Sequence, residues 1–387
     1  MSLLSRWWNR PGARALVYQT ALVVALVALL VSTAQTVMDN VHRAGIKTGF
    51  GFLGEEAGFA INQSLIPYAH ESSYGRAILV CFLNTLLLSA LTIVACTVFG
   101  LVLALFRMSS NWLLSKLAEG YVELFRNVPL LLQLFFWYNA ALRALPGKRE
   151  SIDFFGVAYL NIEGLFVPVP VFHEGSSRVL IVVLIMAVAA VILHFWAARR
   201  QVRTGQPFPS FRVGLGLIVV VPALVATMFG FPVTWDVPHF ERFNFVGGTE
   251  VQPEFVAMML GLTLYNTAFV GEIIRAGIQS VNKGQREAAR SIGMRERAIY
   301  TKIIIPQARR LIIPPLTNQY LNLTKATALA SAIGYPELFW ALGGAIQAQT
   351  GQVLEIQVLT LGTYLAITLG IAGLMAWYNY RIRLVEQ

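Results

Sequence analysis

Charged side chains are scarce in this sequence. Only 13% of its 387 residues are Asp, Glu, Lys or Arg, whereas 56% are apolar, and the mean hydropathy is positive. A soluble core of this size would not need so many apolar residues in long runs. The composition therefore indicates a membrane protein that crosses the bilayer several times.

The residues of common catalytic, metal and nucleotide sites are also few. Five histidines are scattered along the chain, and neither His70 nor His173, each followed by Glu, has the second histidine that a zinc-binding helix needs. Cys81 and Cys96 both fall inside one apolar run, where sulfur behaves as a small apolar group. No Gly-x-x-x-x-Gly-Lys-[Ser/Thr] pattern occurs, so the usual ATP phosphate loop is absent. An intramembrane enzyme would need a nucleophile with a base or a metal cluster, which no pairing here supplies.

Apolar runs near the length of a bilayer span recur along the chain. They predict an all-α, polytopic membrane protein with about eight transmembrane helices. The predicted spans are residues 16–31, 77–106, 128–145, 179–196, 213–231, 255–274, 311–333 and 358–378.

Basic residues are distributed unevenly among the short loops. Arg6, Arg10 and Arg14 precede the first span without an acid, and a second acid-free basic loop joins the fourth span to the fifth. Because short basic loops stay on the cytoplasmic side, both termini are predicted to be cytoplasmic, and the basic excess is topological rather than a sign of nucleic-acid binding. The first run could instead be a signal sequence, although its removal would leave the later basic loops needing an outside amino terminus. The second basic loop contains Arg199, Arg200, Arg203 and Arg212.

The loop between the sixth and seventh spans is the most charged segment. Residues 275–310 contain nine basic residues and two acids, which places the loop in the cytoplasm. Within it, residues 285–292 are predicted to form a short helix that Gly293 ends, because glycine tolerates a left-handed backbone. A second helix is predicted over residues 295–304, and Pro306 marks the start of the next span.

The small residues of the first loop helix suit contact with another protein. Glu287 is expected at the helix start, where the helix dipole favours a carboxylate. Ala288 and Ala289 would leave a smooth face that a partner can approach closely. The loop is therefore predicted to be a docking element for a soluble partner.

The loop contains, in order, Glu287-Ala288-Ala289, three residues, Gly293, nine residues and Ile-x-Ile-Pro ending at Pro306. This pattern resembles the EAA loop of ABC importer permeases. The resemblance implies a type I ABC importer permease core, whose coupling helix sits in a groove of a separate cytoplasmic ABC ATPase dimer. That dimer would bind ATP and Mg²⁺, so this chain is expected to hold no cofactor or metal and to catalyse no covalent chemistry.

The resemblance extends to two blocks of the chain and is to amino-acid importer permeases in particular. The first block, residues 84–139, includes Tyr-Val-Glu-Leu-Phe-Arg-Asn-Val-Pro at 121–129, where the family usually has Gly-Thr in place of Asn127 and Val128. The second block runs from residue 254 to the end. It has Ala326 and Ala328 where relatives commonly have Asp and Ser, so polar contacts made there by relatives do not carry over.

A hairpin formed by the fourth and fifth spans separates the two blocks. Together with the extra first span, it resembles the longer permease subunits of general L-amino-acid uptake systems. That resemblance implies a heterodimer with a second homologous permease, a periplasmic amino-acid-binding protein, and a location in the bacterial inner membrane. The expected domains are an N-terminal helix with its loop (1–76), the first part of the core (77–145), the inserted hairpin with its flanks (146–253) and the second part of the core (254–387).

Polar groups inside a membrane are costly and are therefore candidates for a solute pathway. An amino acid presents an ammonium and a carboxylate, which an acid, a base and neutral hydrogen-bonding groups can bind. Two alternatives remain open: Glu272 could form an interfacial pair with Arg275, and Lys325 could extend to the lipid headgroups. The candidate pathway residues are Glu272, Asn318, Asn322, Lys325 and Thr327.

Two kinds of transporter fit such residues. The sequence favours an ATP-driven importer permease for L-amino acids, with the loop helix transmitting ATPase closure to the adjoining spans. The alternative is an ion-coupled secondary amino-acid transporter that uses Glu272 for proton or sodium coupling. That alternative leaves the charged loop unexplained.

Overall fold

The protein, examined as a computed structural model, is described at residues 11–43, 45, 48–206, 208–228 and 233–382. It divides into two compact units, one formed by Met1–Ala90 with Ala276–Gln387 and the other by Leu91–Arg275. Arg6, Arg10 and the last residues of the fifth predicted span lie outside the described residues.

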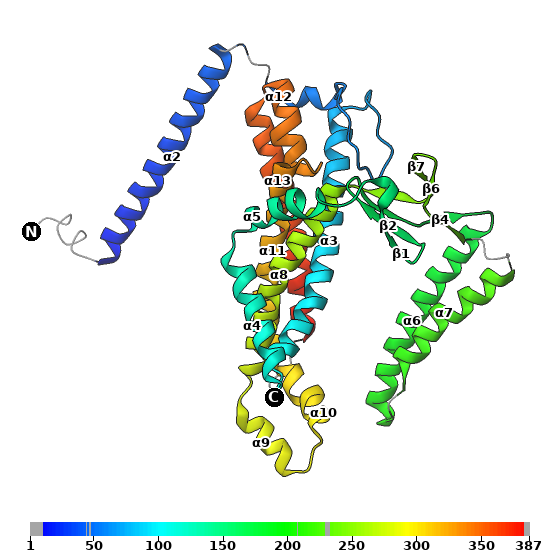
Figure 1. The fold of residues 1–387 in the computed structure, drawn as a ribbon. Coiled ribbons are helices and arrows are strands. Elements are labelled where there is room, and N and C mark those ends of the chain that lie inside the picture. Colours follow the sequence, from blue (N-terminus) through cyan, green and yellow to red (C-terminus); the bar gives the residue numbers. More distant parts are fainter. Residues whose placement is uncertain (1–10, 44, 46–47, 207, 229–232, 383–387) are drawn as a thin grey trace, which may run out of the picture. The chain divides into compact units, whose positions relative to one another are not determined.

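Long apolar helices dominate the described chain (Figure 1). Six of them are long and apolar enough to cross a membrane, and they coincide with the first, second, fourth, fifth, sixth and eighth predicted spans. The predicted helical membrane fold is therefore confirmed. These helices are α2 (Pro11–Arg43), α3 (Tyr74–Arg107), α6 (Ser176–Thr204), α7 (Ser210–Met228), α8 (Pro253–Gln279) and α13 (Val353–Ile382).

The other two predicted spans take less regular forms, so the count of eight is only approximate. The third becomes α5 (Leu130–Phe135), continued by a π-helical segment (Phe136–Leu142), and this apolar stretch is shorter than a full span. The seventh becomes α11 (Ile305–Ala326), which continues as a 3-10 helix (Thr327–Ile333). Pro314 and Pro315 lie inside α11, where they remove backbone donors.

Shorter helices connect these elements. Asn111 begins α4 (Trp112–Asn127), because its side chain accepts hydrogen bonds from the backbone N–H groups of Leu113 and Leu114. The remaining short helices are Phe50–Gly54, Lys148–Glu150, α9 (Lys283–Ser291), α10 (Glu296–Ile299), Tyr300–Ile304, Trp340–Ile346 and α12 (Gln347–Thr350).

Short strands flank the α6–α7 hairpin and correct the all-α prediction for this part of the chain. They form an antiparallel sheet in the order β1-β2-β3-β8 and two antiparallel pairs, the β6-β7 hairpin and β4-β5, whose two strands enclose α6 and α7 in the chain. Runs of three or four residues are too short to give a clear alternating pattern, which is why the sequence did not reveal them. The strands are β1 (Ile152–Phe154), β2 (Ala158–Asn161), β3 (Gly164–Val167), β4 (Val169–Phe172), β5 (Val233–Asp236), β6 (His239–Glu241), β7 (Asn244–Val246) and β8 (Thr249–Val251).

The unit formed by Met1–Ala90 and Ala276–Gln387 has its main core at one end of its helices. Loop residues near Phe52 pack there with the first turns of α3 and with the segment that follows residue 334. The cluster consists of Phe52, Ala57, Ile61, Tyr74, Ala77, Val80, Cys81, Leu338, Ala341, Leu342, Ile346 and Ile356. Both cysteines of the chain are free and buried, as apolar groups are.

In the unit formed by Leu91–Arg275, α3 and α8 approach each other closely at two glycines. A Cβ on Gly100 would lie 2.6 Å from Val270 Cγ1, and a Cβ on Gly271 would lie 2.9 Å from Leu103 Cδ2. Small residues at such crossings let helix backbones pack closely inside a membrane.

We expect Gly100→Leu and Gly271→Leu to destabilise the protein by about 1–3 kcal/mol each, because the added side chain has no space at this crossing. Thermal unfolding of the purified protein measures the effect. Gly120→Leu on α4 is the control, since a Cβ there meets nothing within 4 Å. Equal unfolding temperatures for all three variants would contradict the close crossing.

Candidate functional site: the charged loop and the polar helix face

The charged loop folds as two short helices around a glycine. Asn282 begins α9 by accepting a hydrogen bond from Gly284 N at 2.8 Å. The helix ends before Gly293, whose φ of +77° lies in the left-handed region, and Met294 N then donates to Ala289 O at 3.1 Å. The predicted helix and its glycine stop are therefore confirmed.

The second half of the loop also follows the prediction. α10 continues into a π-helical turn, Tyr300–Ile304, and α11 begins at Ile305. Pro306 occupies the first turn of α11, directly after the π-helical turn, and its missing N–H removes one donor where the helix changes from π to α. The loop thus joins α8 to α11 without an irregular stretch longer than a few residues.

A small apolar core of its own holds the loop together. Ala289, Ile299 and Ile304 are buried there, and Ile278 and Val281 at the start of the loop pack against them. Burial of this kind gives a nine-residue helix a stability that it would lack in isolation. The loop is therefore a folded element with a core of its own.

This core corrects two details of the predicted docking face. Ala289 points into the loop and is only 3% exposed, so it supports the helix from inside, whereas Ala288 and Glu287 are exposed. Glu287 lies beyond the first turn of α9, which contains no acid, so the helix dipole contributes little to it.

Ion pairs to one carboxylate join the two loop helices. Glu296 at the start of α10 pairs with Arg290 and with Arg286, the latter at 3.0 Å. The Arg286 guanidinium also lies 5.3 Å from the centre of the Tyr300 ring. Hydrogen bonds from Arg290 and then Arg286 lower the pKa of the Glu296 carboxyl. Because the folded-state pKa is lowered, these pairs stabilise the loop at neutral pH and are lost only as the pH falls through that pKa.

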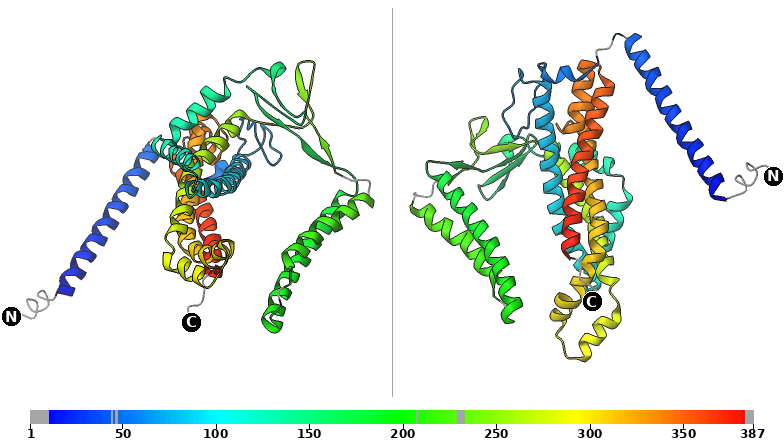
Figure 2. Two further views of the ribbon diagram at one scale, coloured as in Figure 1. Left: turned by 60° about the horizontal axis from the view of Figure 1, so that its bottom comes forward. Right: turned by 180° about the vertical axis from the view of Figure 1, so that it is seen from behind.

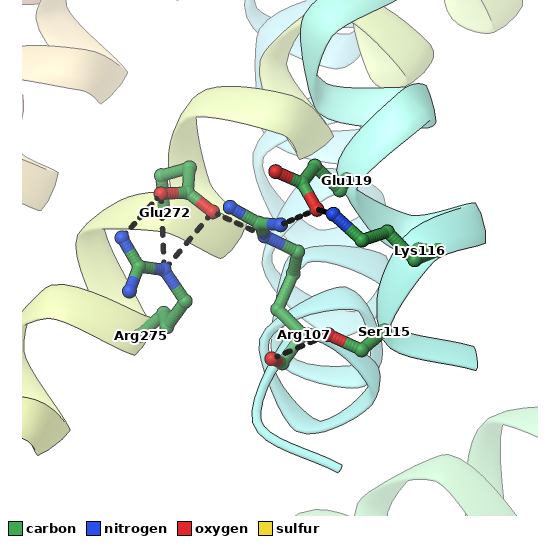
Figure 3. A network of polar contacts seen from close by, with 6 residues as sticks. All are labelled: Arg107, Ser115, Lys116, Glu119, Glu272 and Arg275. Atoms are coloured by element: carbon green, nitrogen blue, oxygen red, sulfur yellow. Dashed lines mark hydrogen bonds and ion pairs between the residues drawn. The ribbon is translucent and has the colours of Figure 1, made fainter. Parts of the chain in front are cut away.

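Glu272 lies in a charged network that joins α3, α4 and α8 (Figure 3). It accepts hydrogen bonds from Arg275 Nη2 at 2.8 Å and from Arg107 Nε at 3.1 Å. Arg107 also pairs with Glu119 at 3.4 Å, and Glu119 with Lys116 at 2.9 Å. The pairing of Glu272 with Arg275 matches the interfacial alternative, and Arg107 is a partner that the sequence analysis did not identify.

Three of the candidate pathway residues share one face of α11. Asn318, Asn322 and Lys325 are four and three residues apart, and all three side chains are exposed. Thr327 does not join them: it is fully buried and donates to Thr324 O at 2.7 Å. The structure therefore brings together two amides and an ammonium on one exposed face of α11.

A buried carboxyl that the sequence analysis missed lies after the 3-10 helix. Glu337 is fully buried, and its two oxygens accept hydrogen bonds from Trp340 N at 2.7 Å and from Tyr364 Oη at 2.8 Å. Asn84 and Thr85 of α3 bind the backbone beside it, at Pro336 O and Leu338 N. The sequence contained one indication of this site, because Glu337 is the one acid between Arg310 and Glu355.

Metal chemistry has no support in the described part of the chain, where no three His, Cys, Asp or Glu side chains come close enough to hold an ion.

Comparison with known proteins places these features in a family. Residues 196–386 match the family described as the binding-protein-dependent transport system inner membrane component. The chain is 45% identical to the putative amino-acid ABC transporter permease protein YhdX of Escherichia coli K12, over 97% of this chain and 96% of that one. It is 44% identical to the general L-amino acid transport system permease protein AapQ of Rhizobium johnstonii, over 97% of this chain and 94% of the relative.

A third relative is 34% identical, the glutamate/glutamine/aspartate/asparagine transport system permease protein BztB of Rhodobacter capsulatus, over 97% of this chain and 95% of the relative. All three relatives thus match from near one end of the chain to the other, including the hairpin. The chain therefore belongs to the family of binding-protein-dependent transport system inner membrane components, which are permease subunits of ABC transporters.

Proposed function

We propose that this chain is the permease subunit through which an ATP-driven importer moves L-amino acids into a bacterial cell. The observation that carries the proposal is the loop between α8 and α11, a folded element with its own core that leaves Glu287 and Ala288 exposed. The names of the relatives support amino acids as the solute class. Family membership favours this function over the ion-coupled secondary transporter.

A separate cytoplasmic ATPase dimer binds ATP and Mg²⁺ in this proposal. The chain has no phosphate-binding loop of its own, so the energy comes from a partner. α9 sits in a groove of that partner, and the apolar contacts of Ala289 with Ile299 and Ile304 carry its movement to α11. Glu296 holds α9 against α10 during that movement through its two arginines.

The charged loop lies in the cytoplasm, as do both termini. Short basic loops stay inside, and the loop carries nine basic residues against two acids. The strands around the hairpin and the loop before α3 then lie in the periplasm, where an amino-acid-binding protein delivers the solute. The four predicted domains keep the boundaries given above.

A second homologous permease completes the pathway. The exposed face of α11 supports this, because Asn318, Asn322 and Lys325 would be costly against lipid hydrocarbon. A partner subunit and an aqueous path between the two permeases remove that cost. The amides and the ammonium then bind the polar groups of the solute, while Thr327 supports the helix from the buried side. Glu272 belongs to the pathway only as part of its ion-pair network.

We expect Glu287→Lys and Ala288→Arg to reduce the amount of ATPase that co-purifies with the permease roughly tenfold or more, as loss of an interface anchor does. Both side chains are exposed, so the fold is unaffected. Mass spectrometry of the complex purified from native membranes measures the retained ATPase.

The control for this docking experiment is Glu71→Lys, which makes the same charge change at an exposed residue in the loop before α3. Gly293→Val should also release the ATPase, because a φ of +77° strains a β-branched residue. Full recovery of the ATPase with all of these variants would refute the docking role of the loop.

We expect Lys325→Met to lower amino-acid uptake in ATP-loaded vesicles by about tenfold, since loss of a charge-assisted hydrogen bond costs about 1.5–3 kcal/mol. Lys325→Arg should restore part of the uptake because it keeps the charge. Lys148→Met is the matched control, because this lysine pairs with Glu163 and Asn244, outside the Glu272 network, and a pair of this exposure contributes little.

ATPase activity in the same vesicles separates a solute site from a structural role. A pathway residue lowers uptake while the ATPase remains bound and active. If Lys325→Met transports at the native rate, the polar face of α11 is not the pathway. Uptake that continues without ATP while an ion gradient is kept would instead support the secondary transporter.

A further inference from the structure

The α6–α7 hairpin has a strongly basic end beyond its apolar part. α6 runs from Ser176 to Thr204, and its 29 residues extend to about 43 Å. A bilayer core of about 30 Å accommodates only the part up to about Phe195. The last turns of α6, the connecting loop and the first turn of α7 therefore lie at the level of the lipid headgroups.

No acid is present to neutralise this end. Between Glu174 and Asp236 the sequence contains five arginines and not a single Asp or Glu. Four of the five lie at this end, and they take part in none of the ion pairs found among the described residues. The four are Arg199, Arg200, Arg203 and Arg212.

Three of these arginines form one surface with an aromatic side chain. Trp196, Arg199, Arg200 and Arg203 are spaced by three and four residues, so they share a face of α6. The Arg200 guanidinium lies 5.6 Å from the centre of the Trp196 ring and 5.9 Å from that of Phe208. Trp196 and Phe208 meet edge to face at 5.5 Å. This arrangement holds one guanidinium in place on an aromatic surface, as at a membrane interface.

A groove between the two helices begins at the same end. Figures 1 and 2 show α6 and α7 side by side along their length, and the groove has a volume of about 430 Å³. His194 and Ser210, 3.4 Å apart, lie at its basic end, and its walls are otherwise almost entirely apolar. It is lined by Ala187, Ala190, Val191, Phe195, Phe211 and Leu215 among others.

We propose that this end of the hairpin binds an anionic phospholipid. The phosphate diester of the headgroup binds Arg199, Arg200 and Arg203, and the acyl chains lie along Ile185, Val188 and Ile192, exposed apolar side chains on the same face of α6 and opposite the groove. The bidentate geometry of guanidinium suits phosphate, and an uncompensated arginine cluster at the end of a membrane helix attracts anionic lipid. The bound lipid fixes the depth of the hairpin in the bilayer, a role that is independent of the transported solute.

The test compares two lipids with identical acyl chains, phosphatidylglycerol and phosphatidylcholine. The intact transporter is titrated with each lipid in mild detergent, and native mass spectrometry counts the lipids that it retains. We expect the native protein to prefer phosphatidylglycerol. Arg199→Gln, Arg200→Gln and Arg203→Gln should each weaken its retention by about fivefold, the effect of one arginine near an anionic surface.

The matched control is Arg178→Gln at the opposite end of α6, which should retain the lipid at the native level. A triple variant replaces the three arginines with lysine: Arg199→Lys, Arg200→Lys and Arg203→Lys. It keeps the charge and therefore the membrane orientation. It should retain the lipid at an intermediate level, because lysine lacks the planar guanidinium that binds phosphate with two hydrogen bonds. Ala187→Phe fills the groove on the opposite face of α6 and should retain the lipid at the native level. Soluble glycerol phosphate should not displace the lipid, because it has no acyl chains.

Two results would overturn the proposal. Equal retention of both lipids by the native protein would show that the arginines contribute only to topology. Loss of a co-purified acidic protein from the glutamine variants, with lipid retention unchanged, would identify the surface as a protein-docking site instead.

Discussion

The cost of placing charge in a bilayer is the constraint on which the rest of this structure depends. Water is absent from the hydrocarbon core, so a polar group there needs a partner inside the protein or a position at the boundary. The chain meets this requirement in three ways. Glu272 is paired with Arg107 and Arg275, Glu337 is enclosed by donors, and most remaining charges lie in loops and at helix ends.

The exposed polar face of α11 is the exception to this pattern. Asn318, Asn322 and Lys325 have exposed side chains on α11, in the part of the chain that matches the family. Such a face is consistent with a subunit that functions only as part of an assembly. The same physical cost that pairs Glu272 within this chain is the reason that we propose a second permease and an aqueous pathway beside α11.

The charged loop and the hairpin end show how the boundary regions are used. In the loop, small apolar contacts and the pairs to Glu296 give a short helix enough stability to transmit movement. At the hairpin end, the arginines have no such acid, and their positive charge remains available to a ligand. In one basic segment a carboxylate pairs with two of the arginines, and in the other no acid lies near the arginines in the sequence.

The sequence by itself determined the helical membrane class, the positions of six long spans and the order of the charged loop, because hydrophobic length and a glycine stop are local properties. It also indicated Gly293 and Pro306 correctly in their local roles. Only the tertiary structure decided that Ala289 faces inward, that Arg107 joins the Glu272 pair and that Thr327 is buried apart from Asn322 and Lys325. The tertiary structure alone also showed the short strands, the contacts of Glu337 and the close crossing of α3 and α8 at Gly100 and Gly271. The contacts of Arg107 with Glu272, of Glu337 with Tyr364 and Asn84, and of Gly100 with Val270 depend on segments that are distant or irregularly connected in the chain, and spacing along one sequence carries no information about which of these side chains meet.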